Sequence, residues 1–264
     1  MKEPNSPYFK NSLRRENASD TISKEERKKV GNIESPRHIL IQAVHIDARS
    51  TDKEKENTQT DLFSILDKGI SLADPAKVLV VDFYTSSSQA ERDKIKTGGQ
   101  ESYAISPVDA RDKATYKLKD CVGLVVVGTD DVLGVSVSLL SHQSPSFLFQ
   151  SEYSESRFKE HLASRMRELV DRCDSKTVEG VIFGGKYMEG ESLVHKRNYR
   201  KDYDRMVGLL KTITMNSTEV EPKIAKKSKT YHGWEDVYFC NKERKLYIIE
   251  FGEPTPRSKD HRKE

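Results

Sequence analysis

The spacing of apolar and polar residues predicts a series of strands and two long helices along the chain. Short apolar runs bounded by turn residues predict strands over 38–46, 77–84, 103–106, 118–127, 132–140, 178–183, 236–240 and 245–251. Apolar residues at helical spacing predict amphipathic helices over 156–173 and 197–213. Ser154 or Ser156 is the expected N-cap of the first, and a shorter helix is predicted between Thr58 and Ile70.

The predicted strands form hairpins. The run 118–127 and the run 132–140 are joined by a turn, and 236–240 is joined to 245–251 in the same way. The first hairpin is apolar at nearly every position, so both faces of its sheet should be covered. Hairpins favour antiparallel pairing, and the two helices must cover a sheet face. The pattern therefore predicts an α/β fold, a layered sandwich of mostly antiparallel sheets with two principal helices, and not a doubly wound parallel sheet.

Composition separates the 264 residues into a core and polar ends. Residues 1–35 carry few large apolar side chains and cannot bury enough surface to offset the entropy of ordering, so we predict a disordered tail. We predict that 36–100 is an extension partly packed on the core, with a role that the sequence does not define. Residues 101–252 are the predicted compact domain, and 253–264 a polar tail.

Charge and cysteine content exclude several classes of protein. The 45 basic and 42 acidic residues are interspersed, and the formal net charge is only +3, which indicates a solvated surface rather than a face for nucleic acid. No apolar run predicts membrane insertion or a secretory signal, so we expect a cytoplasmic protein; export without a classical signal stays open. Cys121, Cys173 and Cys240 are too few and too scattered for a disulfide framework or a zinc site.

One cysteine and one histidine occupy matching ends of the first predicted hairpin. Cys121 begins its first strand, and His142 follows its second strand 21 residues later (142 − 121). The start of one antiparallel strand lies beside the end of the next, so the thiol and the imidazole should be neighbours. This is the minimum arrangement for a thiolate nucleophile. The competing bases are His161 on the polar side of a helix, and His195 and His232 in predicted loops.

Four pieces of sequence occur in a fixed order over roughly 100–250. They are Glu101-Ser-Tyr-Ala-Ile-Ser106 ahead of Thr115-Tyr-Lys-Leu-Lys-Asp-Cys121, the hairpin ending at His142, the helix leading to Val181-Ile-Phe-Gly-Gly185, and Lys196-Arg-Asn198 ahead of a helix and the last strands. Together they resemble the CheD-type chemoreceptor glutamine deamidases. That family shows a GEYAVS-like strand, a Thr-x-x-x-Gly-Ser-Cys turn, a histidine at the end of the following strand, an Ile-Phe-Gly-Gly segment and an Arg-Asn pair.

The resemblance implies an α/β/β sandwich, shared with bacterial toxin deamidases, and a site without metal or organic cofactor. Cys121 matches the family nucleophile, His142 the base, and Thr115, six residues before the cysteine (121 − 115), the threonine that orients the imidazole. The implied function is a hydrolase: a cysteine-dependent protein-glutamine deamidase that converts glutamine to glutamate through a thioester. The implied partner is a protein carrying a target glutamine, a methyl-accepting chemotaxis receptor if the cell is chemotactic. A host-directed effector deamidase is a second enzymatic hypothesis, and the oligomeric state is not defined.

Two departures from the family leave room for an altered substrate or for a site without activity. Lys119-Asp120 stand where the family has Gly-Ser, and the Asp120 carboxylate tends to raise the pKa of the adjacent thiol. The hairpin is also a few residues longer than usual. The alternative is a catalytically degenerate module that binds a receptor or regulator.

Each candidate residue also has an ordinary structural interpretation. Cys121 is then a small buried hydrophobe, His142 a surface histidine and Thr115 a β-branched strand residue. For Gly184-Gly185 we predict a tight turn without a role at the site, and for Trp234 a loop anchor.

Overall fold

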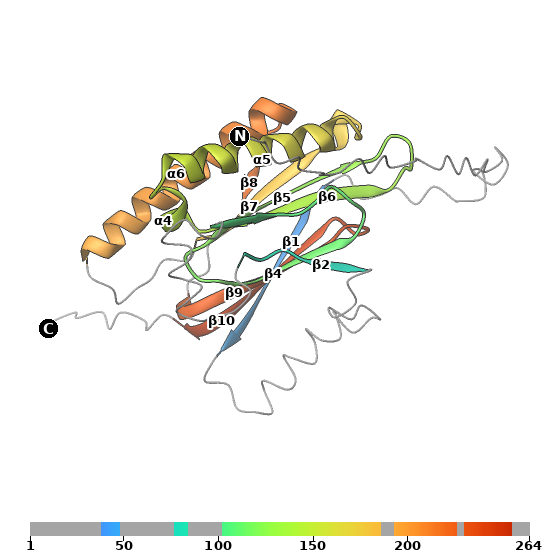
Figure 1. Ribbon diagram of the computed structural model, residues 1–264. Helices are drawn as coiled ribbons and strands as arrows, with labels where there is room; N and C mark the ends of the chain where they lie inside the picture. The colour runs from blue at the N-terminus through green and yellow to red at the C-terminus, as the bar shows by residue number, and fades with distance from the viewer. Residues whose placement is uncertain (1–37, 48–76, 84–101, 186–192, 226–229, 255–264) are drawn as a thin grey trace, which may run out of the picture. The chain divides into compact units, whose positions relative to one another are not determined.

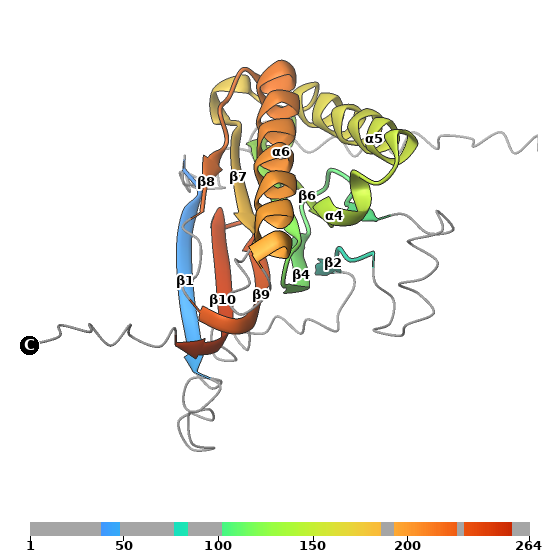
Figure 2. The same ribbon diagram turned by 90° about the vertical axis from the view of Figure 1, so that its left-hand side faces the viewer.

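Two five-stranded sheets stack on each other, and helices cover the outer face of one of them (Figures 1 and 2). The computed structural model describes residues 38–47, 77–83, 102–185, 193–225 and 230–254, which belong to one unit spanning Ser35–Glu264. The predicted tail 1–35, the predicted helix near 58–70 and residues 255–264 lie outside the described residues.

Sheet A places the first and last described strands side by side. In spatial order it contains β1 (Leu40–Asp47), β10 (Lys245–Pro254), β9 (Thr230–Cys240), β4 (Asp112–Leu118) and β2 (Val78–Val80). β9 and β10 form the predicted second hairpin, and β4 pairs antiparallel with β9. At one edge β1 pairs in parallel with β10, and at the other edge β2 pairs in parallel with β4. Both edge strands therefore come from the region before residue 101.

Sheet B is built around the predicted first hairpin. In spatial order it contains β3 (Tyr103–Ile105), β6 (Ser136–Gln143), β5 (Val122–Thr129), β7 (Glu179–Gly184) and β8 (Lys223–Ile224). All its pairs are antiparallel except that of β7 with β8. Every residue of β6, and all of β5 except Thr129, are buried, which confirms that both faces of this hairpin are covered.

Three helices cover the outer face of sheet B: α4 (Pro145–Leu148), α5 (Glu152–Val170) and α6 (Leu193–Thr218). A short 3-10 helix, Ser175–Thr177, follows α5. The prediction of Ser154 or Ser156 as the N-cap of α5 is wrong, because the Ser151 hydroxyl accepts from the Ser154 N–H and the helix begins earlier. Glu152 and Glu155 then occupy the first turn, where the helix dipole favours negative charge.

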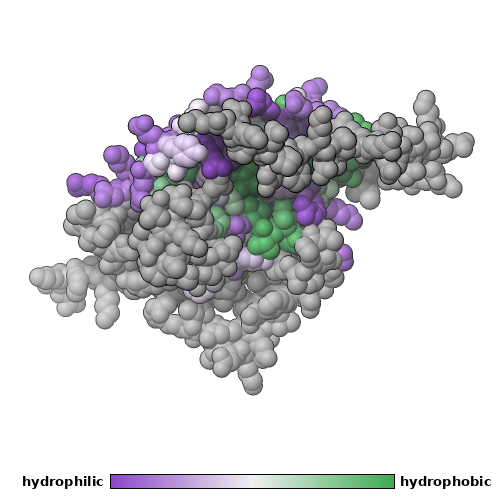
Figure 3. All heavy atoms as spheres, viewed as in Figure 1, coloured by the Kyte–Doolittle hydropathy of each residue, from purple (hydrophilic) through white to green (hydrophobic). Residues whose placement is uncertain are grey.

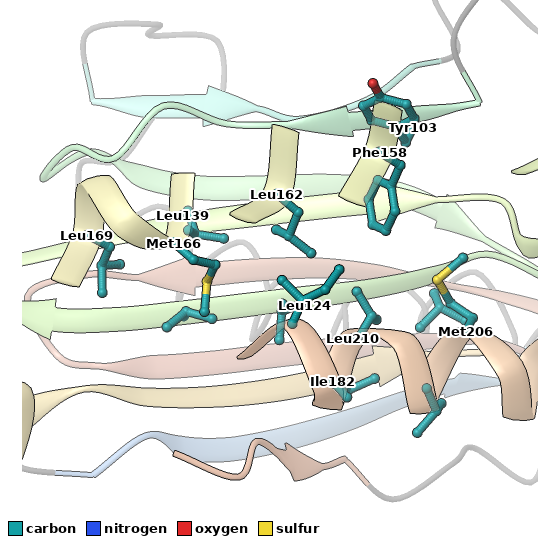
Figure 4. Close-up of a cluster of buried hydrophobic side chains, with 14 of the residues drawn as sticks. Tyr103, Leu124, Leu139, Phe158, Leu162, Met166, Leu169, Ile182, Met206 and Leu210 are labelled. Carbon is teal, nitrogen blue, oxygen red and sulfur yellow. The ribbon is translucent and has the colours of Figure 1, made fainter. Parts of the chain in front are cut away.

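Two buried layers hold the elements together. Between the helices and sheet B lie Leu124, Leu139, Phe158, Leu162, Met166, Met206 and Leu210 (Figure 4). Between the two sheets lie Val125, Val127, Leu140, Val237, Phe239, Leu246 and Ile248. The outer surface over the helices is mostly hydrophilic in the view of Figure 3. This arrangement confirms the layered α/β/β sandwich of mostly antiparallel sheets.

Two strand boundaries differ from the prediction in ways that shape the site. The single strand predicted over 118–127 is wrong: β4 ends at Leu118 in sheet A, and β5 begins at Val122 in sheet B. An apolar run suits either sheet, so its pattern does not reveal a change of sheet. The strand predicted over 77–84 is also too long, because β2 pairs with β4 for three residues only. Among the described residues, no helix combines the length and apolarity needed to cross a membrane.

Candidate active site

The predicted threonine and histidine are in contact across the two sheets. Thr115 lies in β4 of sheet A and His142 in β6 of sheet B, which face each other in Figure 1. The Thr115 Oγ1 and His142 Nδ1 atoms are 2.8 Å apart, a hydrogen-bond distance. Both side chains are buried, with relative exposures of 0% and 1%. The imidazole is therefore held by a hydroxyl from the opposite sheet.

Cys121 lies at the same end of the hairpin and on the same face of sheet B as His142. Val122 is paired with Gln143 and Gly123 with His142, so Cys121 immediately precedes the paired segment. Side chains alternate along a strand, and Cys121 packs in the core between the sheets, where His142 meets sheet A. Nε2 of His142 is buried without a hydrogen-bond partner among the described residues. The thiol and the imidazole thus share a compartment without a hydrogen bond between them.

Burial keeps both groups neutral. It lowers the pKa of His142 from 6.5 to about 3, although the Val81 backbone favours the protonated ring. It also raises the pKa of the Cys121 thiol well above its usual value, and the carboxylates of Asp120 and Asp82 add to that rise. The Sγ atom of Cys121 is 3.9 Å from Oδ1 of Asp120. At neutral pH the pair is a thiol and a neutral imidazole, not a thiolate and an imidazolium.

The surroundings of the ring select its tautomer. Nδ1 faces two oxygen atoms, Thr115 Oγ1 at 2.8 Å and Asp82 Oδ1 at 3.6 Å. The hydroxyl can donate or accept, but a carboxylate only accepts, so Asp82 favours the tautomer that carries its proton on Nδ1. Nε2 is then the unprotonated nitrogen and the one able to act as a base.

Two glycines that the sequence predicts to be a turn without a role fix the backbone of Cys121. The Gly185 N–H donates to the Cys121 carbonyl, with an N···O distance of 2.7 Å. Gly184 and Gly185 have φ angles of +82° and +74°, a region that favours glycine. A Cβ atom at Gly184 would lie 2.6 Å from the Cys121 carbonyl oxygen. The consecutive glycines after a buried strand are the sequence signal for this close approach.

Three residues from the N-terminal extension complete the site, and no motif pointed to them. Val81 and Phe83 belong to the same buried cluster as Cys121. The ring of Phe83 meets the ring of His142 edge-on, with centroids 4.8 Å apart. The Asp82 carboxylate lies 3.6 Å from Nδ1 of His142, and its charge raises the pKa of the Cys121 thiol. These contacts join residues about sixty positions apart, which local patterns do not report.

The competing histidine His161 does not join this site. His161 is exposed on α5 and its Nδ1 lies 2.8 Å from the hydroxyl of Tyr103. His195 and His232 were expected in loops, which is wrong: the backbone places them in α6 and β9.

The remaining singled-out residues lie elsewhere. Trp234 lies in β9 with 42% of its surface exposed, so the loop-anchor prediction is also wrong. Cys173 and Cys240 are buried free thiols, and burial raises the pKa of each to about 11. Lys119 is exposed. Within the described part of the chain, no group of three or more His, Cys, Asp or Glu side chains is arranged to hold a metal ion.

Comparison of the sequence with protein-family models and with curated proteins gives no match. The assignment of a function therefore depends on the site itself.

Proposed function

We propose that this protein is a cysteine-dependent protein-glutamine deamidase. The observation that carries the proposal is the 2.8 Å contact between Thr115 and His142, made beside Cys121 at one end of the hairpin. A nucleophile, a base and an orienting group come from three different strands or their ends. They are the residues that match the CheD-type family in order and spacing.

The proposed reaction begins when Nε2 of His142 takes the proton of the Cys121 thiol. The thiolate attacks the side-chain amide carbon of a glutamine, and the resulting oxyanion is stabilised by neighbouring N–H donors. The tetrahedral intermediate collapses as the imidazolium gives its proton to the departing ammonia, leaving a thioester. Water, deprotonated by the same imidazole, then releases glutamate and the free thiol. Overall, one water is consumed and one ammonia is formed for each glutamine converted to glutamate.

Thr115 acts as a positioning residue in this scheme. In this scheme its hydroxyl accepts from Nδ1–H, which keeps Nε2 unprotonated. Both partners are buried, so the hydrogen bond is shielded from competing water. The partner proposed is a protein with an exposed glutamine, a chemotaxis receptor in a chemotactic cell, and the proposed compartment is the cytoplasm.

The test is ammonia release from glutamine-containing proteins, receptor fragments first, with the converted residue located by mass spectrometry. Wild type is compared with Cys121→Ala and with Cys240→Ala, a matched change at another buried free cysteine. We expect Cys121→Ala alone to abolish the signal. Equal ammonia release from wild type and Cys121→Ala would falsify the proposal for that substrate.

One observation favours a second candidate, a binding module without chemistry. Asp120 stands where the family has serine, and together with burial and Asp82 it opposes formation of the thiolate. Such a module would bind a receptor fragment equally well as wild type and as Cys121→Ala. Equal binding by wild type and Cys121→Ala, with no ammonia released from any bound fragment, would support the binding module over the deamidase.

A further inference from the structure

We infer that residues 78–83 form an intramolecular cap over the Cys121–His142 site, and that a protein substrate reaches the thiol only when this cap is displaced. The inference rests on the proposed function, because it concerns access to the same two groups. It assigns a role to one of the two described parts of the extension 36–100, for which the sequence defined no role.

The cap is anchored beside the orienting threonine. Its β2 strand pairs in parallel with β4 from Val78 opposite Asp112 to Val80 opposite Ala114. The Val81 N–H then donates to the Ala114 carbonyl at 2.8 Å, one residue before Thr115. Figures 1 and 2 both show β2 at the free edge of sheet A beside β4. The segment is thereby directed over the end of β4 that contacts His142.

The next residues close on the imidazole itself. Asp82 places Oδ1 at 3.6 Å from Nδ1 of His142, and Phe83 packs its ring edge-on at 4.8 Å between centroids. Val81 and Phe83 are buried in the inter-sheet core that also contains Cys121. Consecutive residues thus contact the imidazole and pack in the same core cluster as the nucleophile.

A closed site of this kind excludes a protein substrate. Relative exposure is 3% for Cys121 and 1% for His142, so a glutamine side chain cannot approach the sulfur in this state. The central strands β4, β5 and β6 are each paired on both sides. Among the described strands, β2 and β3 are both paired on one side only and over three residues. β3 is also held by Tyr103, whose ring packs against Phe158 in the core under the helices, so β2 is the neighbour of the site that opens more easily.

The experiment measures alkylation of Cys121 in the full chain by a small thiol reagent, with Cys173 and Cys240 as internal references. Phe83→Ala removes the ring that covers His142, and Val81→Asp introduces a charge into the buried anchor. We expect each to speed alkylation of Cys121 relative to the two reference cysteines by at least ~10-fold, because local opening limits access to buried groups.

Ile39→Ala is the matched control. Ile39 lies in the same inter-sheet core with 5% exposure, but it immediately precedes β1, at the opposite edge of sheet A. Its truncation should loosen the core without selectively exposing Cys121. The cap is overturned if neither cap variant accelerates Cys121 over the reference cysteines, or if Ile39→Ala accelerates it equally.

The same variants separate the cap from the proposed chemistry. Selective alkylation in the cap variants without ammonia release from any substrate supports the cap and counts against the deamidase. Ammonia release at the same rate by wild type and Phe83→Ala, with equal alkylation of Cys121, supports the deamidase and overturns the cap.

Discussion

At the scale of single residues, burial outweighs charge in this site. The carboxylate of Asp82 lies 3.6 Å from Nδ1 of His142, a distance at which an ion pair would raise the pKa of an exposed histidine. The ring is 1% exposed, and desolvation lowers its pKa to about 3 instead. The same desolvation is the main reason that the Cys121 thiol stays protonated. Transfer of a proton between the two groups therefore requires a change in their surroundings, such as the entry of a polar substrate.

Thr115 offers the most direct test of the positioning role. Thr115→Val keeps the side-chain volume but removes the hydroxyl that contacts Nδ1. We expect kcat/KM for ammonia release to fall roughly 10²-fold, the usual effect of a misplaced catalytic group, and stability to fall by about 1 kcal/mol. Thr115→Ser retains the hydroxyl and should retain most of the activity. Equal activity of the two variants would show that the contact is only structural.

The neutral state of His142 predicts a loss of stability in acid. In the unfolded chain the ring has its ordinary pKa of 6.5, and in the folded protein a pKa of about 3. Below pH 6.5 the unfolded state binds a proton that the folded state does not, so stability falls as the pH is lowered toward 3. At pH 4 the loss from this group is roughly 3 kcal/mol.

The measurement is urea unfolding of wild type and His142→Gln at pH 7 and pH 4. His142→Gln lacks the titrating ring, so wild type should lose more stability between the two pH values. The facing groups Asp82 and Cys121 are present in both proteins and cancel in the comparison. Equal losses would mean that folding does not exclude the charged imidazole.

At the scale of elements, the position of Cys121 depends on the connection that follows β7. Gly184 ends β7 at φ +82°, and its missing Cβ would approach the Cys121 carbonyl to 2.6 Å. Gly184→Ala should lower the free energy of unfolding by about 2 kcal/mol or more, because it combines a left-handed backbone with a clash. Gly208→Ala in α6 meets nothing within 4 Å and should raise stability by about 0.5–1 kcal/mol.

Chemical denaturation of both alanine variants checks this pair of predictions, and alkylation of Cys121 reports the local effect. Gly184→Ala should change the alkylation rate of Cys121, while Gly208→Ala should leave it as in wild type. A destabilising effect of the same size from both would show that glycine content, and not the approach to Cys121, decides the outcome.

The elements that the sequence predicts well are those fixed by local spacing. α5 follows from Phe158, Leu162, Met166 and Leu169 at helical intervals, all of which are buried. The assignment of strands to sheets does not follow, because it depends on partners distant in sequence. β1 pairs with β10 across most of the chain, and the apolar run after Thr115 is divided between two sheets.

The site shows the same division. The contact of Thr115 with His142 is one that the sequence predicted, through the resemblance of its motif to the CheD-type family. The approach of Gly185 to Cys121 and of Phe83 to His142 involves residues separated by about sixty positions. The first contact is decided by the pairing of β5 with β7 in sheet B, and the second by the position of residues 81–83 against His142. The paired glycines signal that some close approach occurs, but no local pattern identifies either partner.

At the scale of the whole molecule, sheet B couples the two buried layers. Alternate residues of β5 face opposite sides: Leu124 packs under the helices, and Val125 packs against sheet A. Among the described elements the helices cover sheet B, and Val237, Phe239, Leu246 and Ile248 of sheet A pack against its other face. A change in the helical layer should therefore reach sheet A through β5 and β6.

This coupling predicts that the described unit unfolds in one cooperative step. Trp234 is the only tryptophan and lies in β9 of sheet A, so its fluorescence reports on the layer farthest from the helices. Far-UV circular dichroism reports mainly on α5 and α6.

Phe158→Ala truncates a fully buried ring under the helices and should lower the free energy of unfolding by about 3–5 kcal/mol. Both signals should shift to lower urea together, because neither layer retains a closed core without sheet B. A fluorescence transition that stays at its wild-type midpoint while the circular dichroism transition moves would show that sheet A is stable on its own.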